Sequence, residues 1–217
     1  MYKAFPELTF DFTAKVEHIL KHRSLFPELG RLGCVFMVSA VESLSDTVLA
    51  HLEKGHTRAD VFEALAIVRQ AGISLRPSLV SFTPWTTLND YLDVLEVVEA
   101  QSLIDHVDPV QYTIRLLIPP GSALLDRPAI QPFLGPHDQA SFTYRWTHPD
   151  PRMDDLHQVV SGVVEEATRA DEDPAATFDR VRALAYAARG DQVPARSSPA
   201  LRLGRSRPPR LTEPWFC

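Results

Sequence analysis

Four apolar stretches of strand length recur along the first 120 residues. Residues 8–15 (LTFDFTAK) alternate apolar and polar positions, which predicts a strand with one buried face. Residues 34–43 (CVFMVSAVES) form a continuous apolar run, as is typical of a parallel strand buried on both faces, and residues 73–82 (ISLRPSLVSF) and 110–118 (VQYTIRLLI) are predicted as the third and fourth strands. We therefore predict four strands in this region.

Segments with helical spacing of apolar residues lie between these strands. Residues 16–33 predict a helix that ends near Gly33, which suits a C-cap. A second helix is predicted from a Ser45–Asp46 cap through residues 59–72, and a third over residues 87–104, with Thr87 or Asn89 near its cap. Strands and helices that alternate at this spacing indicate βαβ units, hence an α/β fold with about four parallel βα units. Four strands are too few to close an eight-stranded barrel.

The alternation ends after Pro120, and the rest of the chain has a different character. Residues 126–152 are rich in Pro, His and aromatic residues and predict irregular structure. Residues 153–170 and 174–190 predict two helices, the second with Pro174 in its first turn. Residues 194–217 hold five Arg and five Pro with a single acidic residue, and they predict an extended tail. The expected units are residues 1–125, 126–193 and 194–217.

Composition excludes several classes of protein. The net charge of −6 argues against a nucleic-acid-binding protein. No apolar run approaches the length of a membrane span, and the first ten residues lack the charged and apolar regions of a signal peptide. Two distant cysteines give no disulfide framework. We expect a cytoplasmic protein that acts on a small molecule or an unknown substrate.

Candidate site residues follow from the predicted topology, because working residues in parallel α/β folds lie at the carboxyl ends of the strands. Arg76 and Arg115 lie within apolar runs, where an unpaired charge is costly, so each needs an anionic partner. That partner is either a protein carboxylate such as Glu42 or the carboxylate or phosphate of a ligand. Lys15 suits a site or the exposed face of its helix equally well. The complete candidate set is Thr13, Lys15, Ser39, Glu42, Ser43, Arg76, Ser81, Thr83, Arg115, Pro119, Pro120 and Gly121.

Three further features have an ordinary structural explanation beside a functional one. In IPPGS, two prolines and a glycine fix a turn and leave backbone groups bare, which suits a flat ligand or a plain loop. His18 and His22 have zinc-binding spacing, but a third ligand is not evident, and a solvated helix face is favoured. Cys34 begins an apolar strand and is expected to be an inert buried thiol.

Residues 7–125 resemble the second half of the core of a radical S-adenosylmethionine (SAM) enzyme. SAVES (39–43) resembles the segment after the fourth barrel strand, ISLRPSLV resembles the fifth strand, and LLIPPGS resembles the sixth strand and its turn. The resemblance implies the C-terminal half of a partial (β/α)6 TIM-like barrel, followed by a small helical extension and an extended tail. The ending RLTEPWFC is similar to that of the CUAEP/CCAEP-tail radical SAM family.

The resemblance also implies roles for the candidate residues. Glu42 and Ser43, with Ser39 nearby, would bind the ribose and the amino acid group of SAM. Arg76 would pair with the SAM carboxylate, with Lys15 and Arg115 as rivals. Pro119, Pro120 and Gly121 would frame the adenine through backbone contacts. The full-length enzyme would use a 4Fe–4S cluster to cleave SAM into methionine and a 5′-deoxyadenosyl radical that acts on an unknown substrate, and a cobalamin-binding domain upstream is common in the wider superfamily.

The chain departs from the superfamily at its cluster motif. Three cysteines in a C-x-x-x-C-x-x-C loop hold the cluster, and neither that loop nor the first two strands is present in this sequence. Cys34 and Cys217 cannot replace three thiolates. We expect a truncated chain that lacks the N-terminal half of its own barrel, binds no 4Fe–4S cluster and is inactive alone. Cys217 is expected to belong to a redox tail cut before a Sec or Cys followed by Ala-Glu-Pro.

Two other functions stay open. One is a barrel lyase that uses Lys15 as a Schiff-base amine, since a strand-end lysine near arginines can have a lowered pKa. The other is a non-catalytic binding module, whose basic tail recruits an acidic partner.

Overall fold

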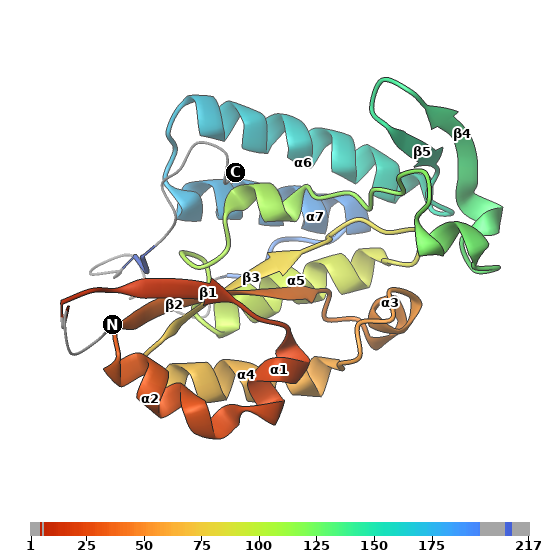
Figure 1. Cartoon of the computed structure of the whole chain (residues 1–217). Coiled ribbons are helices and arrows are strands. Elements are labelled where there is room, and N and C mark those ends of the chain that lie inside the picture. Colours follow the sequence, from red (N-terminus) through yellow and green to blue (C-terminus); the bar gives the residue numbers. More distant parts are fainter. Residues whose placement is uncertain (1–4, 6, 196–206, 210–217) are drawn as a thin grey trace.

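A three-stranded parallel sheet forms the centre of the molecule (Figure 1). The computed structural model describes residue 5, residues 7–195 and residues 207–209. The strands are β1 (Phe10–Thr13), β2 (Cys34–Glu42) and β3 (Ser74–Leu79), in the order β1-β2-β3. Both pairings are parallel, so the predicted α/β class and the first three predicted strands are confirmed.

The first predicted helix is broken into three short pieces. They are α1 (Val16–Lys21), the 3-10 turn η1 (Arg23–Leu25) and α2 (Phe26–Arg31). The break has a clear cause, because Pro27 has no N–H to continue a helix and instead stands in the first turn of α2. Gly33 lies after α2 with a φ of 96°, and a Cβ there would lie 2.6 Å from the carbonyl oxygen of Leu8. A glycine is therefore required at this turn into β2.

The second predicted helix is also divided, into α3 (Asp46–His51) and α4 (Arg58–Gln70). Glu53 and Gly55 between them have left-handed φ values of 50° and 70°, which end α3. Thr57 then starts α4 with a capping box to Asp60. The third predicted helix, α5 (Leu88–Ala100), starts as expected at Thr87, whose side chain accepts a hydrogen bond from the backbone N–H of Asp90.

The prediction of a fourth strand over residues 110–118 was wrong. This segment begins as the 3-10 turn η2 (Pro109–Tyr112) and then makes one isolated parallel bridge between Phe82 and Arg115. The Phe82 N–H donates to Ile114 O at 2.9 Å, and the Leu116 N–H donates to Phe82 O at 2.8 Å. Beyond the bridge the chain leaves the sheet, because Ile118 O accepts a hydrogen bond from Tyr144 N–H at 2.8 Å. Residues 116–118 thus bond to this later segment and do not extend the sheet.

Residues 126–152 are more regular than predicted. They contain an antiparallel hairpin formed by β4 (Leu134–Asp138) and β5 (Thr143–Trp146), preceded by the 3-10 turns η3 (Ala123–Asp126) and η4 (Gln131–Phe133). Strands of four and five residues have too few alternating apolar and polar positions for the pattern to be recognised in a sequence rich in Pro and His.

The two predicted C-terminal helices are confirmed as α6 (Pro151–Arg169) and α7 (Pro174–Arg189), with Pro174 in the first turn of α7. Helix α7 packs against α5 through polar groups. Arg182 and Glu99 form a buried ion pair with an N–O distance of 3.5 Å, and Tyr186 donates a hydrogen bond to Glu96 at 2.6 Å. The helical extension is thereby fixed to the α/β part of the chain.

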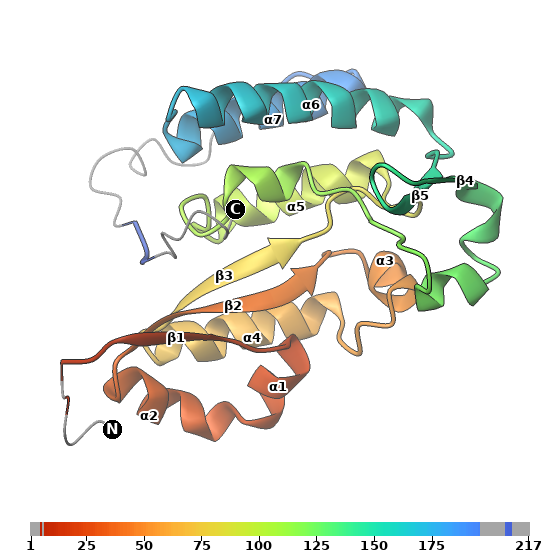
Figure 2. The same ribbon diagram turned by 45° about the horizontal axis from the view of Figure 1, so that its top comes forward.

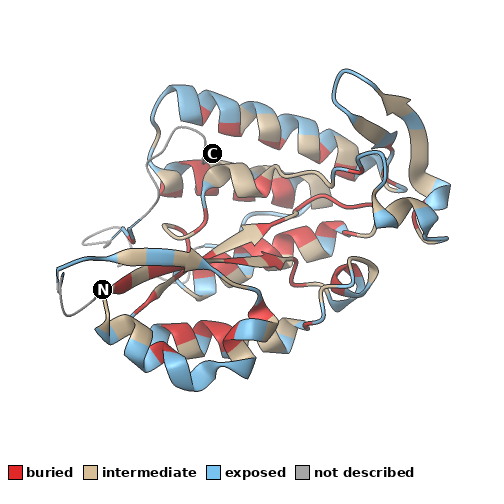
Figure 3. Ribbon diagram, in the orientation of Figure 1, coloured by how far each residue is buried: buried red, intermediate tan, exposed pale blue. Residues whose placement is uncertain are grey.

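Helices α1, α2 and α4 lie along one face of the sheet (Figure 2). Buried residues are concentrated between these helices and the strands and again between α5, α6 and α7 (Figure 3). One apolar cluster includes Val16 of α1, Met37 of β2, Leu92 of α5 and Phe178 of α7. The division at residues 125 and 193 stays a prediction.

Candidate functional site

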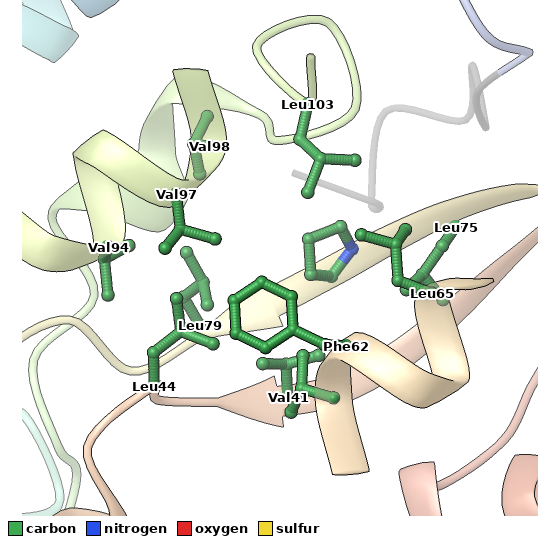
Figure 4. A pocket seen from close by; sticks show the side chains of 12 residues that line it. Val41, Leu44, Phe62, Leu65, Leu75, Leu79, Val94, Val97, Val98 and Leu103 are labelled. Atoms are coloured by element: carbon green, nitrogen blue, oxygen red, sulfur yellow. The ribbon is translucent and has the colours of Figure 1, made fainter. Parts of the chain in front are cut away.

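The two faces of the sheet differ in polarity. Val41, Leu75 and Leu79 point toward α4 and α5 and line an apolar groove there (Figure 4). On the opposite face, Val38 pairs with Arg76 and Ala40 pairs with Ser78. Side chains alternate between the faces of a strand, so the candidate Arg76 lies on the face away from the groove.

Glu42 is the last residue of β2, and its backbone has an unusual conformation. Its φ is 64°, a left-handed value that costs a non-glycine residue roughly 1 kcal/mol. The Glu42 carbonyl accepts a hydrogen bond from Val80 N–H at 2.8 Å, which ties the end of β2 to the chain after β3. Its carboxylate Oε1 lies 2.9 Å from the Lys54 Nζ. Strained backbone of this kind clusters at functional sites.

Lys54 and His56 hold the end of β2 and were not predicted from the sequence. The ring of the buried His56 has Nε2 3.2 Å from Val41 O and Nδ1 3.3 Å from Lys54 O. The loop between α3 and α4 is therefore fixed against the strand, with the Lys54 ammonium directed at Glu42. The available signal was KGHT, a cation beside a glycine in a short turn, but the prediction of one continuous helix over this region hid the loop.

The serines near Glu42 are buried but differ in their surroundings. Ser43 Oγ accepts a hydrogen bond from Ser45 N–H at 3.1 Å, just beyond the end of β2. Ser39 pairs with Pro77, which lines the groove, so its side chain lies on the helix-covered face. Its Oγ has no hydrogen-bond partner among the described residues. Ser43, unlike Ser39, therefore lies at the same end of β2 as Glu42.

Arg76 has the anionic partner that its burial requires, but the partner is not Glu42. Its Nη2 lies 2.7 Å from Asp108 Oδ2, and its side chain is 8% exposed against 51% for Asp108. Arg76 also lies three residues before the end of β3, which places its Cα roughly 10 Å from the level of Glu42. The guanidinium is thus neutralised within the chain.

Arg115 is likewise paired, on the side of α6. Its Nη1 lies 2.7 Å from Asp154 Oδ1, its Nη2 donates to Trp146 O at 2.8 Å, and its Cζ lies 3.6 Å from the centroid of the Trp146 ring. Burial lowers the pKa of the nearby His157, and the positive charge of Arg115 adds to this shift. Arg115 therefore links β5 to α6.

The other candidates are exposed or hydrogen-bonded within the chain. Lys15 is 67% exposed and lies 3.5 Å from Glu17. Ser81 donates to Gln111 O at 2.7 Å, and Thr83 bonds Thr86 within its own turn. Thr13, Pro119, Pro120 and Gly121 are exposed, and Gly121 has the left-handed φ of 81° expected for a turn.

The carboxyl ends of β2 and β3 are thus the place where candidates come together. We call the set Glu42, Ser43, Lys54, Ser81 and Thr83 the site edge. The Glu42–Val80 hydrogen bond joins its two halves, and the Glu42–Lys54 pair provides adjacent charges of opposite sign. Arg115 is directed toward α6 instead, and among the described residues no hydrogen bond or ion pair joins Lys15 or the Pro119–Gly121 turn to the site edge.

An iron–sulfur cluster does not fit the described residues. No three His, Cys, Asp or Glu side chains among them are grouped closely enough to hold a metal ion. Burial, with the nearby charge of Asp11, raises the pKa of Cys34 to about 11, so its thiol stays protonated and is a poor metal ligand. The other candidate, Cys217, lies outside the described residues.

In the described part of the chain, every helix is too short or too polar to cross a lipid bilayer.

Comparison with protein-family models gives no match for this chain, and comparison with curated proteins gives none either. Among solved structures, the chain is similar to the cobalamin-dependent S-adenosylmethionine radical enzyme OxsB. The form with aqua-cobalamin bound has 16% sequence identity and a TM-score of 0.62, over 74% of this chain and 29% of that chain. The form with aqua-cobalamin and S-adenosylmethionine bound has 15% identity, the same TM-score and the same coverage. The fold of the chain is thus similar to part of that enzyme, and the chain spans less than a third of that protein's length.

Proposed function

We propose that this chain is part of a radical SAM enzyme core and that its site edge holds the amino acid and ribose parts of SAM. The observation that carries the proposal is the Glu42–Lys54 pair at the end of β2, in a fold similar to part of OxsB. SAM, when bound beside a reduced 4Fe–4S cluster, supplies a 5′-deoxyadenosyl radical. The residues of this chain contribute binding and orientation.

The charges of the pair match the ligand. An α-amino acid group carries an ammonium and a carboxylate on one carbon, and Glu42 and Lys54 present the complementary charges 2.9 Å apart. Both side chains are largely shielded from water, which strengthens charge-assisted hydrogen bonds to a ligand. Ser43 is next to Glu42 and would bind a ribose hydroxyl, and the Pro119–Gly121 turn would pack on the adenine.

Lys54 replaces Arg76 as our first choice for the SAM carboxylate. Arg76 and Arg115 already have carboxylate partners at 2.7 Å, so a ligand would have to displace Asp108 or Asp154. Lys54 also has a partner, but Glu42 is itself proposed to turn to the ligand ammonium. One ligand would then satisfy both members of the pair at once.

The cluster and the rest of the barrel would have to come from polypeptide outside this sequence. Its described residues offer no three-cysteine set, and the similarity spans 29% of the OxsB chain. The outer edge of β1 would be the place where further parallel strands add to complete a partial barrel. OxsB is a cobalamin-dependent enzyme, which makes a cobalamin domain in the longer protein part of the same proposal.

The test is SAM affinity in the longer protein that carries the cysteine motif. A Lys54→Met variant should bind SAM about ten-fold more weakly, since one charge-assisted contact is worth about 1.4 kcal/mol or more. Arg115→Met, which removes a cation from outside the site edge, should leave the affinity unchanged. If Lys54→Met binds normally and Arg76→Met does not, the carboxylate belongs to Arg76 and our assignment is wrong.

The assignment to the CUAEP/CCAEP-tail family rests on residues outside the described part of the chain and stays a prediction. Reading the coding DNA beyond Cys217 tests it, because a TGA codon followed by Ala-Glu-Pro codons supports a selenocysteine and unrelated codons contradict it. The lyase alternative gains no support from the structure, since Lys15 is exposed beside Glu17. Borohydride trapping with carbonyl substrates should give no adduct at Lys15.

A further inference from the structure

His56, in the loop between α3 and α4, is a buried histidine whose two ring nitrogens both face backbone carbonyl oxygens. Nε2 lies 3.2 Å from Val41 O at the end of β2, and Nδ1 lies 3.3 Å from Lys54 O. A carbonyl oxygen only accepts hydrogen bonds, and a neutral imidazole has a single N–H. The neutral ring therefore bonds one of these oxygens and turns a nitrogen lone pair toward the other. The imidazolium, which has two N–H groups, donates to both.

His148, before α6, is buried to the same extent as His56, but its surroundings suit a neutral ring. Each of the two histidines is 7% exposed. Nε2 of His148 lies 2.9 Å from Thr86 O, which requires an N–H on that nitrogen. The Asp150 N–H donates to Nδ1 at 2.9 Å, so Nδ1 is an acceptor there, although Asp150 O lies 3.0 Å away. The two histidines thus differ in their hydrogen-bond partners and not in their burial.

Most charged groups around the loop of His56 are paired with one another. Lys54 pairs with Glu42 of β2, Glu17 of α1 with Lys15, Glu53 with Arg127 and Arg58 with Asp93, while Asp46 of α3 accepts a hydrogen bond from Arg58 N–H. Asp60 in the first turn of α4 differs, because it bonds the uncharged N–H and hydroxyl of Thr57. These hydrogen bonds lower the pKa of Asp60, and the charge of His56 contributes to the same shift. The carboxylate of Asp60 in turn favours a positive charge on His56.

The two carbonyl groups that His56 meets belong to the backbone of the site edge. Lys54 O is the carbonyl of the residue whose ammonium lies 2.9 Å from Glu42 Oε1, and Lys54 N–H donates to Leu49 O at 3.1 Å. Val41 O also accepts a hydrogen bond from Ser43 N–H at 2.8 Å. The ring of His56 therefore joins the loop that carries Lys54 to the end of β2, where Glu42 and Ser43 lie.

We propose that His56 is a positively charged latch, which in its protonated form holds this loop against β2 with Lys54 directed at Glu42. Loss of the proton removes one of the two hydrogen bonds and sets a lone pair against a carbonyl oxygen. The loop is thus fixed below the pH at which His56 releases its proton, and it loosens above that pH. His56 is a positioning residue, since it acts through Lys54. This inference does not depend on the proposed function, because its test contains no SAM.

Ring-nitrogen NMR of the isotope-labelled full chain identifies the protonated nitrogens of each histidine. At about pH 7.5 a free histidine is about nine-tenths neutral. We expect two protonated ring nitrogens in His56 at this pH and one in His148, which is the matched control. The signals missing from His56→Gln and His148→Gln variants assign the two rings. A His56 ring with one protonated nitrogen at this pH would overturn the proposal.

Hydrogen exchange at the Lys54 amide tests the latch itself. As the pH rises through the titration of the His56 ring, this exchange, corrected for its intrinsic pH dependence, should become about ten-fold faster, since one hydrogen bond is lost. His56→Gln should exchange fast at every pH, because a glutamine carries both N–H groups on one nitrogen. His148→Gln should keep the profile of the parent chain. If His56 titrates and the protection of Lys54 does not change in the parent, which needs no variant to fold, the histidine is no latch.

Discussion

At Glu42 the backbone and the side chain have opposite effects on stability. The left-handed φ of 64° is unfavourable for a residue with a Cβ, while the carboxylate gains the Lys54 ammonium at 2.9 Å. The position of Glu42 at a strand end could be predicted from its sequence pattern. Its conformation and its partner could not, because both depend on a loop that the helical pattern of residues 45–72 conceals.

Two substitutions at Glu42 separate these effects. Glu42→Ala loses the ion pair and keeps the strained backbone, whereas Glu42→Gly loses the pair and relieves the strain. We expect Glu42→Gly to be more stable than Glu42→Ala by about 1 kcal/mol in urea unfolding. Equal stabilities would mean that the backbone at this position is not strained.

His106 makes stability depend on pH. Burial lowers its pKa, with smaller contributions from Arg76 and Arg69, while its hydrogen bond to Leu75 O acts in the opposite direction. The folded pKa is thus below the unfolded value of about 6.5, so the unfolded chain binds more protons as the pH falls through that range. Stability should be fully present above about pH 6.5 and decrease below it.

Thermal unfolding between pH 5 and pH 7 checks this prediction. His157 has a pKa shifted in the same direction and will contribute in the same range. A His106→Gln variant should therefore show a shallower decrease than the parent, and a slope that does not change would contradict the role of His106.

At the scale of elements, the sequence pattern predicts an element boundary well where a single residue of a turn or cap determines it. Gly33 was predicted as a C-cap, and Thr87 or Asn89 was predicted near an N-cap. The structure has the turn at Gly33 and the N-cap at Thr87, and each depends on the local chemistry of one residue. The segment 110–118 was predicted wrongly because its apolar residues are as compatible with a strand as with the turn and extended chain that the structure has there. It bridges to Phe82, beyond the end of β3, and then bonds to Tyr144 of β5, and these partners are far away in the chain.

Gly33→Ala tests the first of these turns. A Cβ at this position meets the backbone oxygen of Leu8 at 2.6 Å in addition to the left-handed φ. Gly72→Ala is the matched control, since its φ is 71° but no atom lies within 4 Å of the added Cβ. We expect Gly72→Ala to cost about 1 kcal/mol and Gly33→Ala about 2 kcal/mol more in chemical denaturation. Similar costs would show that Leu8 moves aside freely.

The contact between α5 and α7 makes a prediction about the helical extension. Breaking the buried Arg182–Glu99 pair with Arg182→Met removes a cation 3.5 Å from a buried carboxylate and should cost about 3 kcal/mol. Arg169→Met removes an exposed pair with Glu165 and should cost less than about 0.5 kcal/mol. If both variants unfold alike, the extension contributes little to the stability of the α/β part.

For the whole molecule, the sequence pattern was sufficient to predict a parallel α/β fold, but it could not predict which candidates would meet. The candidate site residues at strand ends were predicted from topology alone. The structure shows that they lie on different faces of the sheet and bond to different residues. Arg76 and Arg115 were singled out because charge in an apolar run needs a partner, and both have one inside the chain. Lys54 was not predicted because it lies in a polar loop, where a charged residue needs no buried partner.

The measurement that tests the central claim most directly is an amide NMR titration of the isotope-labelled chain with SAM. The account predicts that the amides of Glu42, Ser43, Lys54 and Gly55 shift together, with one dissociation constant of about 1 mM because no cluster contributes to binding. In a Glu42→Ala variant these shifts should weaken. If the amides of the site edge stay unchanged at a SAM concentration about ten times higher, the site edge does not bind SAM and the proposed function is wrong.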